Sequence, residues 1–281
     1  MPRPLRRLGG PFAAAVLGLA VAPLVADAVL VAPHALFIDD RERSGEIFLV
    51  NPSDEAEEVT LEFQFGYPAT DSTGEVGLTL IAEPPAGAPS AAAWLRAFPR
   101  RVRLAPGQRQ RVRVLATPPA DLPDGEYWSR LIVTSRAAQA PLALTGDSSV
   151  QAGITFELRT ITSVAYRKGE LTTGVRLDAF RASATADTLE AWVHLAREGV
   201  AAYLGSVAFD LRDRSGRSVQ RWDTPIAVYY EQHRRFALPL DSVAPGSYEL
   251  RLRVSTARQD IGEEHVLPAD PIERALPVEI R

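Results

Sequence analysis

The sequence predicts an all-β protein, built from two tandem β-sandwich domains that follow a signal peptide. Apolar and polar residues alternate with a period of two over most of the chain, and clusters of Pro, Gly, Ser and Asp interrupt the alternation at short intervals. Between Val59 and Phe65, for example, every second residue is apolar, as a half-buried strand requires. Many short strands with little helix favour antiparallel sandwiches.

The first 28 residues have the pattern of a secretory signal peptide. A positively charged start, an apolar core and a small-x-small cleavage sequence follow one another at Arg3 to Arg7, Phe12 to Ala22 and Ala26 to Ala28. The apolar core is too short to cross the ~30 Å hydrocarbon layer of a membrane. We therefore expect cleavage near Ala28, a periplasmic protein of 253 residues, and no membrane insertion after cleavage.

Composition excludes several classes of function. The chain has no cysteine, which rules out thiol catalysis, cysteine metal sites and redox sensing. The full chain has a net charge of −4, and removing a leader with three arginines and one aspartate leaves −6. A mildly acidic protein without a basic excess is not expected to bind nucleic acid.

Strands in the first half are separated by recognisable turns. The sequence predicts further strands at Glu46–Val50, Gly77–Ala82, Arg101–Leu104, Gln110–Thr117, Gly125–Thr134 and Ser149–Arg159. A turn at Ala105–Gly107 joins the third and fourth of these. The Ala-rich segment Ser90–Ala97, which Pro99 follows, is the one expected helical piece.

The second half repeats this organisation. Strands are expected at Thr188–Ala196, Ser206–Leu211, Val219–Trp222, Ile226–Tyr230, Phe236–Leu240 and Ser247–Val254. Tyr127 and Tyr248 each enter a strand just after a Pro/Gly turn, where a tyrosine hydroxyl can tie the corner to nearby backbone. With the boundary near Arg167–Gly169, we expect a first domain over residues 29–167 and a second over residues 168–281.

One stretch of the first domain resembles a known family. The run P-x-x-V-x-L-x-P-G-Q-x-Q-x-V-x-V from Pro99 to Val114, followed by LPDGEY at Leu122–Tyr127, is similar to the N-terminal domain of periplasmic chaperones that assemble pili by the chaperone–usher route. The resemblance implies two immunoglobulin-like sandwiches set at an angle with a binding cleft between them. It also implies a pilin-like or other incomplete β-rich subunit as client, and an outer-membrane usher as a further partner.

The segment Ser149–Arg159 is the candidate client-binding strand. Its apolar side chains alternate on one face, at Val150, Ala152, Ile154, Phe156 and Leu158. In the resembling family this strand fills the groove of the incomplete subunit, a mechanism called donor-strand complementation. A plain core strand alternates in the same way, so both interpretations stay open at this point.

The resemblance also implies a basic pair that holds the carboxylate at the subunit's C-terminus. Alignment of the family's first strand and last strand of domain one puts His34 and Ser163 at these two positions, so both basic residues are absent. Arg159, Arg167 and Lys168 are the nearby residues that could substitute, because guanidinium and ammonium groups suit a carboxylate.

No sequence pattern indicates catalysis, a metal or a cofactor. The histidines are scattered and show no metal-ligand spacing; they are His34, His194, His233 and His265. The alternating arginines between Arg100 and Arg113 have two interpretations: the solvent-facing surface of a sheet, or a basic strip that docks a partner such as an usher. The rival function is a non-catalytic structural or adhesive surface module; an enzyme has no supporting residue constellation.

Overall fold

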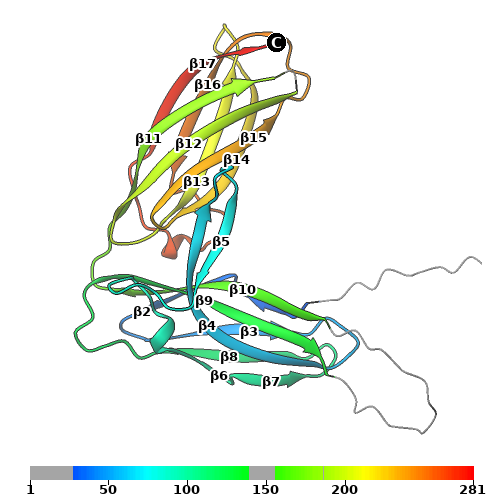
Figure 1. Ribbon diagram of the computed structural model, residues 1–281, viewed down its shortest axis with the longest axis vertical. Coiled ribbons are helices and arrows are strands. Elements are labelled where there is room, and N and C mark those ends of the chain that lie inside the picture. Colours follow the sequence, from blue (N-terminus) through cyan, green and yellow to red (C-terminus); the bar gives the residue numbers. More distant parts are fainter. Residues whose placement is uncertain (1–27, 139–155, 186) are drawn as a thin grey trace, which may run out of the picture.

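The computed structural model describes residues 28–138, 156–185 and 187–281, which form four β-sheets in two domains (Figure 1). The expected signal peptide, apart from Ala28, lies outside these residues. The first domain contains β1 (Leu30–Ala32), β2 (Ala35–Asp39), β3 (Ser44–Val50), β4 (Glu57–Thr70), β5 (Val76–Ile81), β6 (Leu95–Phe98), β7 (Arg101–Leu104), β8 (Arg109–Ala116), β9 (Gly125–Ala137) and β10 (Glu157–Lys168). The second contains β11 (Thr173–Ala184), β12 (Thr188–Gly199), β13 (Tyr203–Arg212), β14 (Ser218–Val228), β15 (Glu231–Pro239), β16 (Gly246–Ser255) and β17 (Ile272–Ile280).

Domain one is a sandwich of two sheets. One sheet has the order β1-β3-β8-β6, and the other has the order β2-β10-β9-β4-β5, with β7 also paired to β4. Alternate residues of both sheets point inward and form one buried cluster, which includes Leu49 on β3, Val112 on β8, Leu61 on β4, Leu131 on β9 and Val164 on β10. The period-two pattern of the sequence is therefore the pattern of a core between two sheets.

Domain two is a second sandwich. The sheet β11-β12-β15 packs against the sheet β14-β13-β16-β17 around a core that includes Val193, Phe209 and Leu252. The expected tyrosine corners are confirmed in both domains. Tyr127 Oη donates to the Pro123 carbonyl at 2.9 Å, and Tyr248 Oη donates to the Ala244 carbonyl at 2.7 Å.

Two local predictions were wrong. The expected helix at Ser90–Ala97 is a 3₁₀ turn over Ala92–Trp94 followed by β6, because pairing with β8 buries Leu95 and Ala97 on one face. The two strands expected at Val219–Trp222 and Ile226–Tyr230 are one strand, β14, which stays continuous through Pro225 because it is an edge strand. No helix within the described residues is long and apolar enough to cross a membrane.

The β4–β5 hairpin projects from domain one and lies against domain two (Figure 1). At its tip, the Gly74 carbonyl accepts a hydrogen bond from the backbone N–H of Arg235 on β15 at 2.9 Å. Gly74 has φ +81°, and a Cβ there would lie 2.8 Å from the Arg235 backbone nitrogen. Only glycine fits this contact, which fixes the hairpin on the second domain.

Candidate functional site: the cleft between the domains

The two domains meet at a buried carboxylate, that of Glu126 on β9, which is 2% exposed. Its Oε1 accepts hydrogen bonds from Trp128 Nε1 at 2.8 Å and from the backbone N–H of Ala202 in domain two at 3.1 Å. Its Oε2 accepts a hydrogen bond from Arg167 Nε at 2.8 Å. A buried carboxylate is tolerated only when it is paired, so these contacts bind the domains in one arrangement.

Arg167 completes this clamp from β10. Its Nη1 donates to the His265 carbonyl of domain two at 2.8 Å, and its guanidinium carbon lies 4.3 Å from the centre of the Phe37 ring. The Phe37 ring in turn stacks on His265, with 4.6 Å between ring centres. Arg167 is thus committed to holding the domains together, and it is not the free cation that the substitution hypothesis requires.

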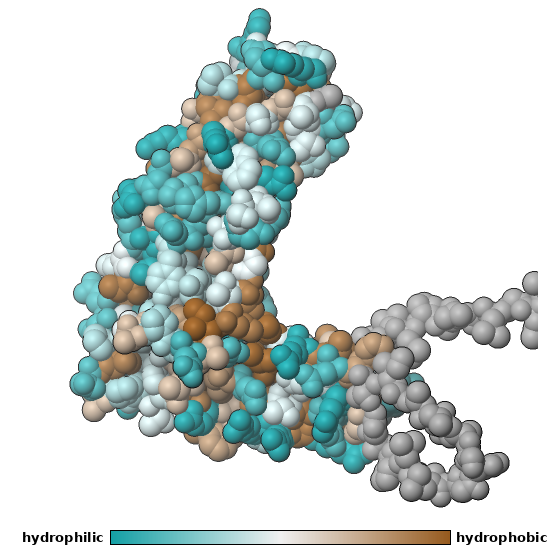
Figure 2. All heavy atoms as spheres, viewed as in Figure 1, coloured by the Kyte–Doolittle hydropathy of each residue, from teal (hydrophilic) through white to brown (hydrophobic). Residues whose placement is uncertain are grey.

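A cavity of about 190 Å³ opens beside this clamp. Its walls come from both domains and include Leu78, Arg130 and Ser163 on one side and Leu204 and Tyr229 on the other. Apolar surface gathers in the angle where the two domains meet (Figure 2). The cleft therefore combines an apolar lining with a small number of polar groups, as binding sites usually do.

Arg130 on β9 is one of two arginines that line this cavity, and Arg258 is the other. Arg130 is 7% exposed, its Nε donates to the Gly66 carbonyl at 3.0 Å, and its guanidinium carbon lies 5.0 Å from the Tyr229 ring centre. Its Nη2 is buried and has no hydrogen-bond partner among the described residues. An unpaired buried donor on a charged group costs about 1–3 kcal/mol or more, so this nitrogen favours an anionic ligand.

Two hydroxyl groups lie next to this guanidinium. Ser163 stands directly opposite Arg130 in the β9–β10 register, and its Oγ lies 3.3 Å from Tyr229 Oη. Gly66 leaves room for the arginine, because a Cβ there would lie 2.6 Å from the Thr79 carbonyl and 3.3 Å from Arg130 Cγ. A guanidinium nitrogen with neighbouring hydroxyls is a donor set that matches a carboxylate.

The other position named from the resemblance, His34, lies at the rim of the same cavity. Its Nε2 is 3.4 Å from Asp260, whose carboxylate also pairs with Arg258 at 2.5 Å. The hydrogen bond from Arg258 holds the pKa of Asp260 down to about 2. The Arg258 cation is consequently already neutralised, which leaves Arg130 as the cation of this cavity that has an unpaired donor.

Arg159 and Lys168, the remaining possible substitutes, have other partners. Arg159 pairs with Glu157 at 3.0 Å on the exposed part of β10. Lys168 donates to the Leu122 carbonyl and lies 3.8 Å from Asp124, at the corner that leads into β9. Neither residue lines the cavity.

The inward-facing side chains of β10 become more exposed toward the start of the strand. Val164 and Tyr166 are fully buried inside the sandwich, Leu158 on the same face is half-buried, and Phe156 is 59% exposed. Val150, Ala152 and Ile154 lie outside the described residues. The plain-core interpretation therefore fits the second half of the strand, whereas Phe156 presents a large apolar surface to solvent.

The outer edge of β10 is partly uncovered. β9 pairs with it from Glu157 to Lys168, but β2 pairs only from Ser163 to Arg167. The Ser163 N–H points to the β2 side, where it donates to the His34 carbonyl at 3.2 Å. Every second N–H of a strand points to the same edge, so the N–H groups of Ile161 and Arg159 also point to the β2 side. No described strand pairs with them there, and they are available to hydrogen-bond an added strand.

Sequence reasoning missed Arg130. The signal that could have identified it is a single charged residue within the otherwise apolar run YWSRLIV at Tyr127–Val133. In a strand buried on both faces, a lone arginine needs a specific reason, such as a ligand. Only the register shows that this residue stands beside Ser163, where the family position lacks its cation.

Two further expectations can be placed on the structure. Arg109, Arg111 and Arg113 are exposed on β8, where Arg111 lies 3.7 Å from Glu46 and Arg109 covers the Phe48 ring at 4.1 Å. The histidines that looked scattered are not all separate, because the rings of His194 and His233 stack with 3.6 Å between their centres.

No family model and no curated protein matches the sequence. Solved structures similar to the chain include the CsuC–CsuE chaperone–tip subunit complex of Acinetobacter baumannii Csu pili, at 11% identity and TM-score 0.44, covering 91% of this chain and 100% of that one. The Pseudomonas aeruginosa CupB2 chaperone is 13% identical with TM-score 0.43, covering 88% and 98%. The Salmonella enterica SafA pilin–SafB chaperone complex is 12% identical with TM-score 0.40, covering 89% and 96%.

Proposed function

We propose that this protein is a periplasmic chaperone that binds an incomplete β-rich subunit, such as a pilin, by adding strand β10 and the residues before it to the subunit's sheet. Binding needs no covalent chemistry and no cofactor. The observation that carries the proposal is that apolar side chains become exposed at the start of β10: Leu158 is half-buried, and Phe156, just before the strand, is exposed beside an open strand edge. Delivery to an outer-membrane usher is the expected next step for such a complex.

Arg130 is the proposed anchor for the subunit's C-terminal carboxylate. Its unpaired Nη2 and the hydroxyls of Ser163 and Tyr229 converge on the cavity between the domains. In this protein the anchoring cation would come from β9, one strand away from the position of Ser163. The carboxylate would satisfy the buried donor, and it would set the register in which the subunit's last strand lies along β10.

Co-purification from the periplasm tests the proposal. The chain is co-expressed with a β-rich subunit encoded by a neighbouring gene, and a stoichiometric complex is expected. Phe156→Thr should lower subunit recovery strongly while changing the stability of the free chain little, because its side chain is already mostly exposed. If the chain purifies as a monomer with every co-expressed subunit, the structural or adhesive module becomes the better interpretation.

The anchor has its own test. Charge-assisted hydrogen bonds contribute about 1.5–3 kcal/mol, so Arg130→Met should weaken subunit binding about 10- to 150-fold. A peptide of the subunit's last residues should bind the native chain more tightly as a free acid than as an amide, and Arg130→Met should abolish this difference. Arg136→Met, on the exposed Glu58 pair and on the same strand as Arg130, is the matched control. Equal binding of acid and amide by the native chain would refute the anchor.

A further inference from the structure

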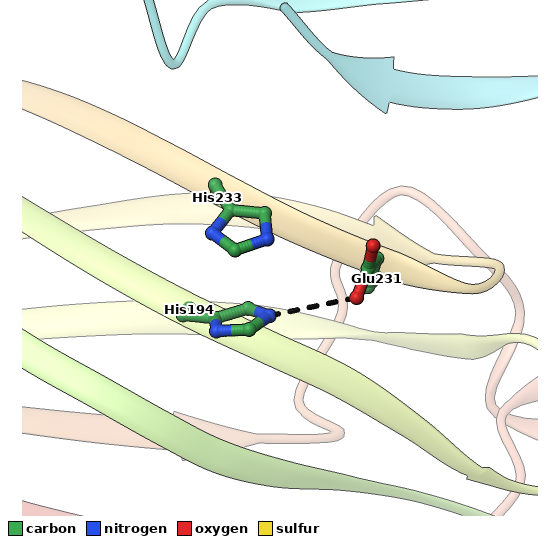
Figure 3. A group of neighbouring side chains, drawn as sticks. All are labelled: His194, Glu231 and His233. Atoms are coloured by element: carbon green, nitrogen blue, oxygen red, sulfur yellow. Dashed lines mark ion pairs between the residues drawn. The ribbon is translucent and has the colours of Figure 1, made fainter. Parts of the chain in front are cut away.

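A cluster of imidazole and carboxylate groups lies on the outer face of the β11-β12-β15 sheet. His194 on β12 and His233 on β15 are directly opposite each other in the antiparallel register, and both rings stand on the face away from the core. Glu231, at the start of β15, points toward His194 (Figure 3). One ligand atom from each of the three side chains can be chosen so that all lie within 4.8 Å of one another.

Within the part of the chain that the structure describes, the central ring nitrogen of the cluster has no hydrogen bond. This atom, His194 Nε2, is buried and lies 3.7 Å from a Glu231 carboxylate oxygen and 3.9 Å from an Asp178 oxygen. These separations are too long for hydrogen bonds. Two atoms that each lie about 2.1 Å from a zinc ion can be up to about 4.2 Å apart, so the separation between His194 Nε2 and the Glu231 oxygen suits a shared metal ion.

A β-bulge brings the second carboxylate to the same place. The β11–β12 register shifts between Leu177 and Ala179, so that Asp178 is the extra residue of the bulge. Bulges commonly re-aim a side chain, and here the Asp178 carboxylate faces His194. Asp178 is also held by Arg176 at 2.6 Å, which leaves the three other side chains as ligands.

We infer that His194, Glu231 and His233 bind a divalent transition-metal ion of the zinc type. Two imidazoles and one carboxylate are the donor set that such ions prefer, and they leave a fourth position for water. The ion would join β12 to β15 beside the point where the β4–β5 hairpin docks, because the His233 N–H donates to Thr70 Oγ1 of the hairpin at 3.0 Å. This inference does not depend on the proposed chaperone function.

Zinc titration of the untagged mature chain tests the inference. After treatment with a chelator and dialysis, calorimetry with ZnCl₂ should show saturable binding of one ion per chain, and zinc should raise the melting temperature. Loss of an outer partner of a metal site costs about 10- to 100-fold in affinity, so loss of a direct ligand should cost at least tenfold. His233→Ala and Glu231→Gln are suitable variants because both side chains are exposed.

Glu249→Gln is the matched control for Glu231→Gln. Glu249 pairs with Arg251 at 2.5 Å on the exposed side of β16, and among the described residues it belongs to no group of imidazoles and carboxylates that could share an ion. The zinc affinity of this variant should stay within twofold of the native value. As an independent readout, Co²⁺ should give visible d–d absorption with the native chain and lose it with His233→Ala. Absence of saturable binding, or binding that survives both His233→Ala and Glu231→Gln, would overturn the inference.

Discussion

Breaking the ion pair between Arg167 and Glu126 should destabilise the whole protein and loosen its domains. In Arg167→Met the buried Glu126 carboxylate loses its charged partner but keeps two neutral donors, Trp128 Nε1 and the Ala202 N–H. Removal of one partner from a buried ion pair lowers the free energy of unfolding by about 3–5 kcal/mol. Because two donors to Glu126 remain, we expect a loss of about 3 kcal/mol for Arg167→Met. The His265 carbonyl loses its hydrogen bond in the same variant.

Glu126→Gln should cost at least as much. If the amide oxygen still accepts from Trp128 and Ala202, the amide NH₂ group faces the Nε–H donor of Arg167, and this largely buried cation loses its counter-ion, so a loss of about 3–5 kcal/mol is expected. Because the two side chains contact each other, the double variant should lose less than the sum of the single variants, by about 1–3 kcal/mol.

Urea unfolding of the mature chain measures these changes. Trp128 lies at the domain interface, so its fluorescence reports separation of the domains, and circular dichroism reports loss of the sheets. The control is Arg159→Met, whose pair with Glu157 on the same strand is 65% and 50% exposed and should contribute less than about 1 kcal/mol. If Arg167→Met loses no more stability than this control, Glu126 and Arg167 do not hold the domains together.

Three further changes test other parts of the structure. The hydrogen bond from Arg258 lowers the pKa of Asp260 to about 2, below the unfolded value of about 3.9. The resulting stability is present above about pH 3.9 and is lost as the pH falls through about 2. Denaturation midpoints of Asp260→Asn should therefore be lower than those of the native chain at pH 7 and equal to them near pH 2. The Tyr203 hydroxyl is buried and has no hydrogen-bond partner in residues 28–138, 156–185 and 187–281, so Tyr203→Phe should leave the melting temperature unchanged or raise it, and a fall of several degrees would contradict this. Gly66→Ala puts a methyl group 2.6 Å from the Thr79 carbonyl and should lower the melting temperature and the affinity for a carboxylate-terminated peptide together; unchanged values would show that the strands adjust freely.

The alternation of apolar and polar residues was enough to predict most strands and the sandwich class. Alternation from Val59 to Phe65 or from Gln110 to Thr117 reflects only which side chains meet water, and that is a local property of each strand. The tyrosine corners at Tyr127 and Tyr248 were equally local, because the turn and the hydroxyl's acceptor lie four residues apart. The Ser90–Ala97 helix failed because propensity yielded to pairing with β8, a partner distant along the chain.

Which residues line the cleft, and which of its cations are already paired, could be seen only in the folded chain. The sequence offered Arg159, Arg167 and Lys168 as possible anchors, but it could not tell which cations already had partners. Arg167 is held by Glu126, which lies 41 residues earlier, and Arg130 reaches the cavity because β9 pairs with β10 in one register.

The histidine cluster shows the same limit. His194 and His233 are 39 positions apart and become neighbours only when β12 and β15 pair, and a bulge then adds Asp178. Sequence spacing identifies a site when its residues share one helix or loop. Across strands, register decides which side chains meet, and register is set by the packing of the whole sheet.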